Sequence, residues 1–415
     1  MSAWRTARRI LCVRLDNMGD VLMSTPAMQA LKDSGADRHV TLLTSRGAAM
    51  LAPHLPMVDR LLTWDAPWAR HDASVREDGV PNDIGDAIGA CAARLAAEAF
   101  DAAVIFNVYT QSALPAAMLC SLAGIPLRLA HCRENPYALL TDWAPETESR
   151  DSLTLPRHEV ARQLDLVRRV GATVADTRMR FAVRDEDRRM LQASMADGFP
   201  RVAPGAPPDP AGNKGLILIH PGATAASRRW PARRFAAVAR ELAMQTGAEV
   251  FLTGSASEAA LAESVCAEAA HPAVRSMAGQ LPLGAMGALI ERANLIISNN
   301  SGPVHLAAAL GTPVVDLYAL TNPQHGPWQV PHRTLFADVP CRYCYKSVCP
   351  EGHHRCLRDV TVEQVLLAAR SLLAGEPQIP DAMPWHPTGG REPCSLSASM
   401  LPITTPQPVS FATAR

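Results

Sequence analysis

Polar residues and a glycine follow an apolar run at residues 295–298, and their types suit an anion-binding site. The apolar run predicts a buried strand, and the turn after it contains Asn300, Ser301, Gly302 and Pro303. Ser301 or Asn300 can cap the helix that follows, and Pro303 fits a first turn, where no amide hydrogen is needed. A helix that begins at the carboxyl end of a strand presents free N–H groups and a partial positive charge. The segment therefore predicts a site for the phosphates of a nucleotide.

A second loop with suitable chemistry follows the predicted strand at residues 216–220. Gly222 lets the backbone approach a ligand, Thr224 and Ser227 offer hydroxyls, and Arg228 or Arg229 can form a bidentate contact with a phosphate. The simpler interpretation is a surface loop with solvated arginines. We favour the ligand, because the Trp-Pro pair that follows predicts a rigid helix entry that would fix both guanidinium groups.

Two further side chains lie next to these loops. Glu258 follows a Thr-Gly-Ser turn after another predicted strand, where it either caps a helix or reaches a ribose hydroxyl. His305 falls in the first turn of the helix after the phosphate loop. A histidine there is more often a packed, hydrogen-bonded residue than a catalyst, so we expect His305 at most to support the phosphate site.

The first half of the chain has the same strand-to-helix arrangement in the sequence RLDNMGD, residues 14–20. Asp20 lies where the next helix begins, so it is either a helix cap or a general base. A helix N-terminus would keep the carboxylate ionised, as a base must be before it accepts a proton.

Four cysteines form the one dense thiol cluster, with two histidines between them. They are Cys341, Cys344, Cys349 and Cys356, separated by two, four and six residues. Four thiolates within sixteen residues can hold a structural zinc. Their spacing differs from the common paired C-x2-C pattern, and cysteines need not bind anything, so both interpretations stay open. No catalytic metal and no cofactor are predicted.

Composition limits the class of protein. The chain has 415 residues, 48% of them hydrophobic and 19% charged, with Lys+Arg and Asp+Glu balanced at 40 each. This length predicts two domains, and the zero net charge gives no sign of nucleic-acid binding. The ten cysteines are irregularly spaced, unlike a disulfide scaffold. We expect no secretory signal, and the apolar stretch at 113–130 is a poor membrane span because prolines, a glycine and an arginine interrupt it. A soluble cytoplasmic protein is the expectation.

Strands alternate with helices along both halves, which predicts an α/β fold with parallel sheets. A proline-rich stretch between them predicts a linker, and the C-terminal end is rich in Pro, Ser and Thr without periodicity. The predicted parts are an N-terminal domain at 8–195, a linker at 196–214, a second domain at 215–375 and a disordered tail at 376–415. The chain lacks the glycine-rich dinucleotide and P-loop motifs and the G-x-S-x-G motif of hydrolases.

Five blocks of sequence together resemble family-nine glycosyltransferases, the bacterial heptosyltransferases of lipopolysaccharide assembly. The blocks are VRLDNMGDVLMSTPAMQALK, HPGATAASRRWPARRFAAVA, FLTGSASE, ISNNSGPVHLAAALGTPVVDLY and CRYCYKSVCPEGHHRCLRDVTVEQV. The resemblance extends over about residues 9–372 and also includes HEVARQLDLV. It implies the GT-B architecture, in which an N-terminal acceptor-side Rossmann-like domain at 8–195 faces a C-terminal nucleotide-sugar-binding Rossmann-like domain at 215–375 across a cleft. It also implies metal-independent, inverting transfer of heptose from ADP-L-glycero-D-manno-heptose to a lipid-linked core oligosaccharide.

The resemblance also implies roles for individual residues. Asp20 matches the proposed base of the family, Thr224 and Arg228 fall where the donor phosphates are held, and Glu258 falls where the ribose is contacted. The segment 300–302 (Asn300, Ser301 and Gly302) falls where the family usually has Asp-Thr-Gly. Arg228 replaces a usual lysine, which keeps the cation but changes its geometry. Asn300 replaces an aspartate, which removes a charge near the donor.

Three other functions remain open at this point. A GT-B sugar-nucleotide 2-epimerase would act on the donor alone, a glycosyltransferase could use a different donor sugar, and a protein without catalysis could simply bind nucleotide. The expected partners are a nucleotide-sugar and a lipid-linked acceptor at the inner membrane, with no nucleic acid. Arg5, Arg8 and Arg9 could dock the chain on the membrane, although a solvated terminus explains them more simply.

Overall fold

Short apolar segments of the N-terminal half form a six-stranded parallel sheet. The computed structural model describes residues 3–35, 37–69, 84–146, 157–195 and 215–376. The sheet order is β3-β2-β1-β4-β5-β6, and all neighbouring strands are parallel. After its first residue, β1 is buried throughout, as a central parallel strand covered on both faces should be. The strands are β1 (Arg9–Arg14), β2 (His39–Thr44), β3 (Arg60–Thr63), β4 (Ala102–Ile105), β5 (Leu127–Cys132) and β6 (Asp142–Pro145).

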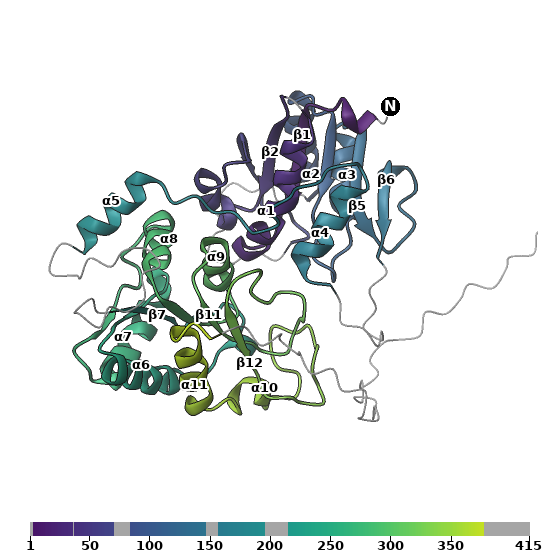
Figure 1. Cartoon of the computed structure of the whole chain (residues 1–415). Helices are drawn as coiled ribbons and strands as arrows, with labels where there is room; N and C mark the ends of the chain where they lie inside the picture. The colour runs from purple at the N-terminus through teal and green to yellow at the C-terminus, as the bar shows by residue number, and fades with distance from the viewer. Residues whose placement is uncertain (1–2, 36, 70–83, 147–156, 196–214, 377–415) are drawn as a thin grey trace, which may run out of the picture. The chain divides into compact units, whose positions relative to one another are not determined.

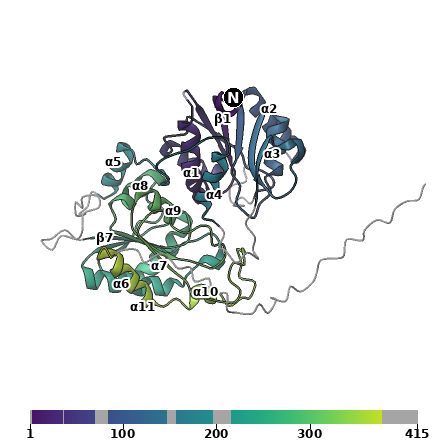
Figure 2. The ribbon, with the colours of Figure 1, turned by 45° about the vertical axis from the view of Figure 1, so that its right-hand side comes forward.

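Helices cover both faces of this sheet (Figure 2). α1 (Met18–Asp33) and α4 (Glu159–Arg168) pack on one face, and α2 (Ile84–Ala97) and α3 (Leu114–Leu122) pack on the other. Short 3-10 helices lie at η1 (Ala3–Arg5), η2 (Arg46–His54) and η4 (Tyr137–Leu139).

The C-terminal half repeats this construction with a second parallel sheet. Its order is β12-β11-β10-β7-β8-β9. The strands are β7 (Leu216–His220), β8 (Glu249–Leu252), β9 (Val274–Ser276), β10 (Leu295–Asn299), β11 (Val314–Leu317) and β12 (His332–Leu335).

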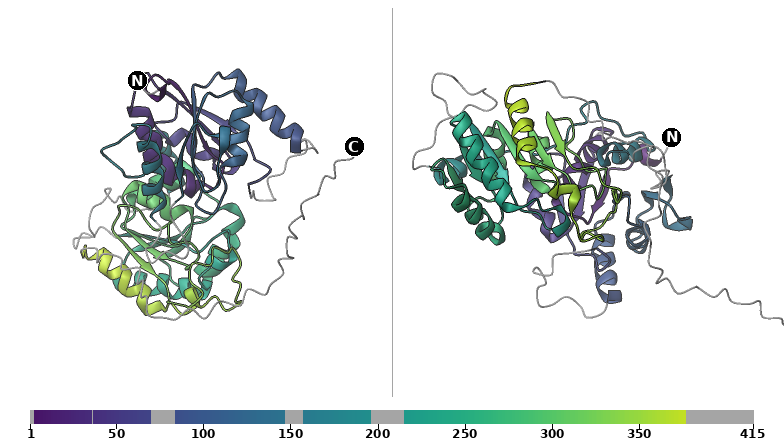
Figure 3. Two further views of the ribbon diagram at one scale, coloured as in Figure 1. Left: turned by 90° about the vertical axis from the view of Figure 1, so that its right-hand side faces the viewer. Right: turned by 90° about the horizontal axis from the view of Figure 1, so that it is seen from below.

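The second sheet is also covered on both faces (Figures 1 and 3). α6 (Ala232–Thr246), α7 (Ala259–Ala269) and α11 (Val362–Leu373) share one apolar cluster, on the face opposite α8 (Leu283–Arg292) and α9 (Gly302–Leu310). α5 (Asp185–Ser194) packs against α8. The remaining short elements are η5 (Ala226–Arg228), η6 (Ala256–Glu258) and α10 (Arg355–Arg358).

One apolar cluster includes side chains from both halves, among them Leu22 and Met23 of α1 and Leu306 of α9. Trp328 adds a polar link, because its indole N–H donates to the carbonyl of Thr177 at 2.8 Å. The start of α1 is thereby held beside the start of α9, and both helices begin where a strand ends.

The predicted α/β fold with parallel sheets is confirmed. The predicted linker at 196–214 lies outside the described residues, and so does the predicted tail except for Glu376. The domain boundaries remain predictions. The apolar stretch at 113–130 divides into α3 and β5, and among the described residues no helix combines the length and apolar character needed to cross a bilayer.

Candidate active site

Asp20 lies in the first turn of α1, which begins four residues after β1 ends. Its carboxylate accepts a hydrogen bond from the backbone N–H of Asn17 at 3.2 Å, so the side chain does cap the helix. The same carboxylate lies 3.3 Å from Nη2 of Arg14. The helix cap uses Oδ2 and the guanidinium approaches Oδ1, so the Asp20 carboxylate can cap the helix and still take part in a reaction.

Arg14 is the centre of a buried ion cluster beneath Asp20. Its side chain is fully buried at the end of β1 and contacts three carboxylates. Besides Asp20, these are Asp16, 3.1 Å from Nε, and Glu159, 3.0 Å from Nη1. Glu159 is the first residue of α4, and its backbone N–H donates to the carbonyl of Gln324 in the second half of the chain at 3.0 Å.

Burial dominates the electrostatics of this cluster. It raises the pKa of Asp20 above the ordinary value, and Glu159 adds to the rise, whereas the guanidinium groups of Arg14 and Arg228 lower it. The direction differs from the sequence expectation because desolvation outweighs the helix N-terminus. Burial likewise raises the pKa of Asp16 to about 6. Although burial opposes it, Arg162 and Arg14 hold the pKa of Glu159 at about 2.

The N-terminus of α9 lies at the carboxyl end of β10, as predicted. Neither predicted capping side chain caps it: the Ser301 hydroxyl donates to the carbonyl of Asn299 at 3.1 Å. The Asn300 amide points inward, where it donates to Oδ2 of Asp316 at 3.0 Å and to the carbonyl of His325 at 2.9 Å. The first amides of α9 therefore have no side-chain cap, which suits an anion.

The first turns of α1 and α9 touch one another. A β-carbon on Gly302 would lie 2.6 Å from Cε of Met18, and one on Gly19 would lie 2.6 Å from Cδ2 of His305. Only glycine allows this approach. His305 is buried, and burial lowers the pKa of its imidazole well below the usual range, with smaller contributions from His325, His158 and Arg228. The ring is therefore neutral at the junction of the two helices.

The loop after β7 separates the roles of its two candidate arginines. Arg229 supports the loop itself, because Nε donates to the carbonyl of Ala223 at 2.7 Å and Nη2 to that of Thr224 at 3.3 Å. Thr224 is exposed, as a ligand-binding residue can be. The Ser227 hydroxyl was expected to face a ligand, but it is buried and donates to the carbonyl of Lys346 at 3.0 Å, so that expectation is wrong.

Arg228 is the arginine that acts on the neighbouring site. Its positive charge lowers the pKa of Asp20 and of His305, although burial is the larger influence on both. Burial lowers the pKa of His325, to which Arg228 contributes, and burial raises the pKa of Tyr318, which Arg228 partly opposes. The structure therefore brings Arg228, Asp20 and His305 within one electrostatic environment, although they are distant in sequence.

Glu258 ends η6 beside the same loop. Its Oε2 accepts the backbone N–H of Ser255 at 2.8 Å, so the predicted cap is present. Its Oε1 lies over Gly222, where a β-carbon would be only 1.9 Å away. Glu258 is also 4.0 Å from Nε2 of the buried His220. Because Gly222 has no side chain, it leaves space for the Glu258 carboxylate and not only for a ligand.

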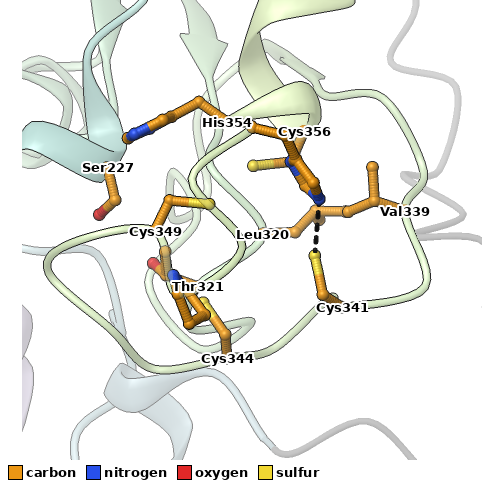
Figure 4. A pocket seen from close by; sticks show the side chains of 11 residues that line it. Ser227, Leu320, Thr321, Val339, Cys341, Cys344, Cys349, His354 and Cys356 are labelled. Carbon is orange, nitrogen blue, oxygen red and sulfur yellow. Dashed lines mark hydrogen bonds between the residues drawn. The ribbon is translucent and has the colours of Figure 1, made fainter. Parts of the chain in front are cut away.

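The four cysteines line one cavity together with Ser227, Thr321 and two histidines (Figure 4). All four are free thiols, half-buried and drawn from residues 341–356. In the part of the chain that the structure describes, no three His, Cys, Asp or Glu side chains are already arranged to hold a metal ion.

Sequence reasoning missed Arg14, Asp16 and Glu159 as parts of the site. The available signals were weak: an arginine interrupts an apolar strand, and a glutamate opens a helix whose next residues are apolar. It also missed Asn299, whose amide donates to the carbonyl of Pro221 at 2.7 Å and whose Oδ1 accepts the N–H of Trp230 at 3.0 Å. These two bonds tie the end of β10 to the loop of Arg228.

One protein family and several of its members resemble this chain. The family model described as glycosyltransferase family 9 (heptosyltransferase) matches residues 88–355. Lipopolysaccharide heptosyltransferase 2 of Salmonella typhimurium is 32% identical over 167 residues, which cover 39% of this chain and 47% of the relative. The chain spans about half the length of the curated relatives it matches.

Two solved structures share the fold over nearly their whole length. The family 9 glycosyltransferase from Veillonella parvula superposes with a TM-score of 0.69 at 24% identity, covering 89% of this chain and 98% of that one. ADP-heptose lipopolysaccharide heptosyltransferase II of E. coli superposes with a TM-score of 0.65 at 22% identity, covering 89% and 99%. The GT-B architecture, two Rossmann-like domains with parallel sheets, is thereby confirmed. With a family model that covers more than half of its residues, the chain belongs to glycosyltransferase family 9, the heptosyltransferases.

Proposed function

We propose that this protein is an inverting, metal-independent glycosyltransferase that moves heptose from ADP-L-glycero-D-manno-heptose to a lipopolysaccharide core or a related lipid-linked acceptor. One observation carries the proposal: Asp20 directly follows Gly19, which packs against His305 at the contact between the N-termini of α1 and α9, and the Asp20 carboxylate lies within the field of Arg228. A base, an anion-binding helix end and a cation are thus close together. Membership of family 9 and the likeness to curated heptosyltransferases support the choice of sugar.

Asp20 acts as the general base. It accepts the proton of the acceptor hydroxyl while that oxygen forms a bond to the anomeric carbon. The bond from the anomeric carbon to the phosphate oxygen breaks, and its electron pair leaves with ADP. Because the hydroxyl attacks opposite to the leaving group, the anomeric configuration inverts. The raised pKa of Asp20 makes the carboxylate a stronger base than an exposed aspartate, and proton transfer of this kind contributes about 10²–10⁴-fold in rate.

The leaving diphosphate is stabilised by fixed groups. Arg228 supplies a cation, and the uncapped first amides of α9 supply aligned dipoles. His305 is neutral, so its ring can donate or accept a hydrogen bond without adding charge. Together these groups can neutralise the charge on the departing ADP. In other glycosyltransferases Mg²⁺ has this role, so the groups support the metal-independent mechanism.

The remaining donor contacts come from the loops after β7 and β8. Glu258 presents a carboxylate that can accept hydrogen bonds from ribose hydroxyls, and Gly222 leaves room for it. Thr224 is exposed on the loop that carries Arg228 and can bind a phosphate oxygen. Asn300 and Ser301 contribute through the backbone turn that opens α9, since their side chains bind other protein groups.

The acceptor places the enzyme at the cytoplasmic side of the inner membrane, as a peripheral protein. Nucleotide-sugars are made in the cytoplasm and the lipid-linked core is assembled there. Arg5 and Arg8 are exposed near the N-terminus, whereas Arg9 pairs with Glu98 at 3.5 Å. The balanced charge of the chain supports no role for nucleic acid.

A donor screen read by mass spectrometry tests the proposal. Purified protein is incubated with ADP-heptose, or with UDP-, GDP- and other ADP-sugars, and with delipidated core oligosaccharides of defined truncation. We expect one heptose to be added to one acceptor, with release of ADP, at a rate that Mg²⁺ or Mn²⁺ leaves unchanged. Consumption of donor without acceptor to give an epimer would instead establish a 2-epimerase. Binding without turnover of any donor and acceptor would establish a nucleotide-binding protein.

A further inference from the structure

The cysteine cavity is lined by none of the residues assigned to the proposed transfer reaction. Its volume is about 20 Å³, which is room for one water-sized occupant and not for an organic ligand. Four thiols and two imidazoles contribute to its wall, so almost every polar group that faces it is a soft metal ligand.

The four cysteines line the wall of one small cavity although their positions span sixteen residues of the chain. A divalent cation bound there would favour ionisation of the surrounding thiols.

The imidazole of His353, beside the cavity, is already oriented to donate a hydrogen bond to a metal-bound thiolate. Nδ1 of His353 accepts the backbone N–H of Arg355 at 3.0 Å, so the ring proton of neutral His353 is on Nε2. Nε2 lies 3.6 Å from Sγ of Cys341, the contact drawn as a dashed line in Figure 4. His353 therefore donates to the sulfur, and its nitrogen is not available as a metal ligand. Hydrogen bonds from outside the ligand set commonly orient metal ligands in this way.

We propose that Cys341, Cys344, Cys349 and Cys356 bind one structural Zn²⁺ ion, with His353 donating a hydrogen bond to the Cys341 thiolate. Four Zn–S bonds of about 2.3 Å form in tetrahedral geometry, and the thiol protons pass to solvent, without any change of oxidation state. The thiols turn inward on binding, since the described side chains are not yet arranged around a metal position. Cys341 and Cys344 have the C-x2-C spacing that lets neighbouring cysteines hold one zinc.

The position of this loop gives the ion a structural purpose. The carbonyls of Lys346 and Ser347 accept hydrogen bonds from the hydroxyl and the backbone N–H of Ser227, at 3.0 and 3.1 Å. Ser227 is the residue before Arg228. The backbone N–H of Tyr345 also donates to the carbonyl of Thr321 at 2.7 Å. A metal that fixes residues 341–356 therefore also fixes the base of the Arg228 loop.

Metal analysis of the full-length protein tests the proposal independently of transferase activity. The wild-type protein, loaded with ZnSO₄ and freed of excess metal, should contain about one zinc per chain. A mercurial that caps thiols should release that zinc in proportion to the thiols modified. Cys341→Ser and Cys344→Ser should retain less than about a fifth of it, because three thiolates hold zinc poorly. Cys266→Ser is the matched control: this half-buried cysteine of α7 lies outside the cavity, so its zinc content should equal that of the wild type.

Several results would overturn the proposal. Wild-type protein that stays metal-free after loading has no such site, and this measurement does not depend on whether the serine variants fold. Disulfides among the four cysteines, detected by mass spectrometry of the alkylated protein, would assign the cluster to redox chemistry. An equivalent of iron in place of zinc would reject the chosen metal. Cys344→His supplies a nitrogen ligand instead, and it should recover at least half of the zinc lost in Cys344→Ser.

Discussion

Gly19 in the first turn of α1 lies directly against the imidazole of His305 in the first turn of α9. A β-carbon at position 19 would approach Cδ2 of His305 to 2.6 Å, closer than real side chains come. Asp20, the next residue, is the proposed base, and His305 lies beside the proposed phosphate-binding turn. This contact thus sets the separation between the proton acceptor and the leaving-group site.

Gly19→Ala should separate the two helix ends. We expect kcat/KM to fall by about 10²-fold, because small displacements of reacting groups are costly, while overpacking lowers the free energy of unfolding by about 1–3 kcal/mol. Steady-state kinetics and urea denaturation measure the two effects. The matched control is Gly89→Ala in α2, where a β-carbon meets nothing within 4 Å. Equal behaviour of the two variants would show that the contact is unimportant.

Asp20→Asn should abolish the base while keeping the size of the side chain. We expect kcat to fall by about 10²–10⁴-fold, while the Kd for ADP, measured by calorimetry, changes less than about threefold. Asp33→Asn at the other end of α1 serves as the control and should leave both unchanged. A parallel loss of ADP affinity and turnover would assign Asp20 a structural role only.

Gly222→Ala should displace the carboxylate of Glu258, because the new methyl group would lie 1.9 Å from Oε1. We expect the KM for the nucleotide-sugar to rise about tenfold or more, the cost of one charge-assisted hydrogen bond, with a smaller effect on kcat. Gly47→Ala, where a β-carbon meets nothing within 4 Å, is the comparison. Unchanged KM in Gly222→Ala would remove Glu258 from the donor site.

Stability should fall as the pH falls below 6.5, partly because of His131. Burial lowers the pKa of this histidine from 6.5 to about 4, and its Nε2 contacts the carbonyl of Arg162 at 2.9 Å. Between pH 6.5 and pH 4 this histidine is protonated in the unfolded chain but not in the folded chain. The contribution of His131 to the free energy of unfolding is therefore complete above pH 6.5 and is lost progressively as the pH falls towards 4. The cost at pH 5.5 is about 1 kcal/mol. Urea denaturation at pH 7.5 and 5.5 should show a smaller difference for His131→Gln than for the wild type; an identical difference would contradict this account.

Most of the fold could be predicted from local sequence. The strand predicted at 216–220 is β7, and the helix predicted after the turn of Asn300 and Ser301, with Pro303 in its first turn, is α9 (Gly302–Leu310). Apolar periodicity, together with Gly and Pro at the element ends, was sufficient to predict these two elements. The strands β5 (Leu127–Cys132), β6 (Asp142–Pro145), β9 (Val274–Ser276) and β12 (His332–Leu335) were missed. β5 follows α3 after a short turn, so both elements lie within one apolar stretch whose composition does not distinguish them.

The candidate site was predictable only where chemistry follows a strand end. Asp20, Arg228 and Glu258 all follow strand ends, at the sheet edge where ligands bind, but it was the family resemblance that chose Arg228 over Arg229 and gave Glu258 a ligand role. The contact of Arg14 with Glu159 was not predictable, because 145 positions separate the two residues and their pairing depends on tertiary packing. The direction of the Asp20 pKa depended on burial, which the local sequence does not reveal.

The buried pair of Arg14 and Glu159 also limits how this chain can be recombined with its relatives. A chimera that receives a foreign β1 without the matching α4 would lose this contact and leave Glu159 with Arg162 as its remaining counter-charge, and weakening a buried ion cluster in this way is destabilising. Crossover points therefore belong outside residues 9–168, so that both elements are inherited together.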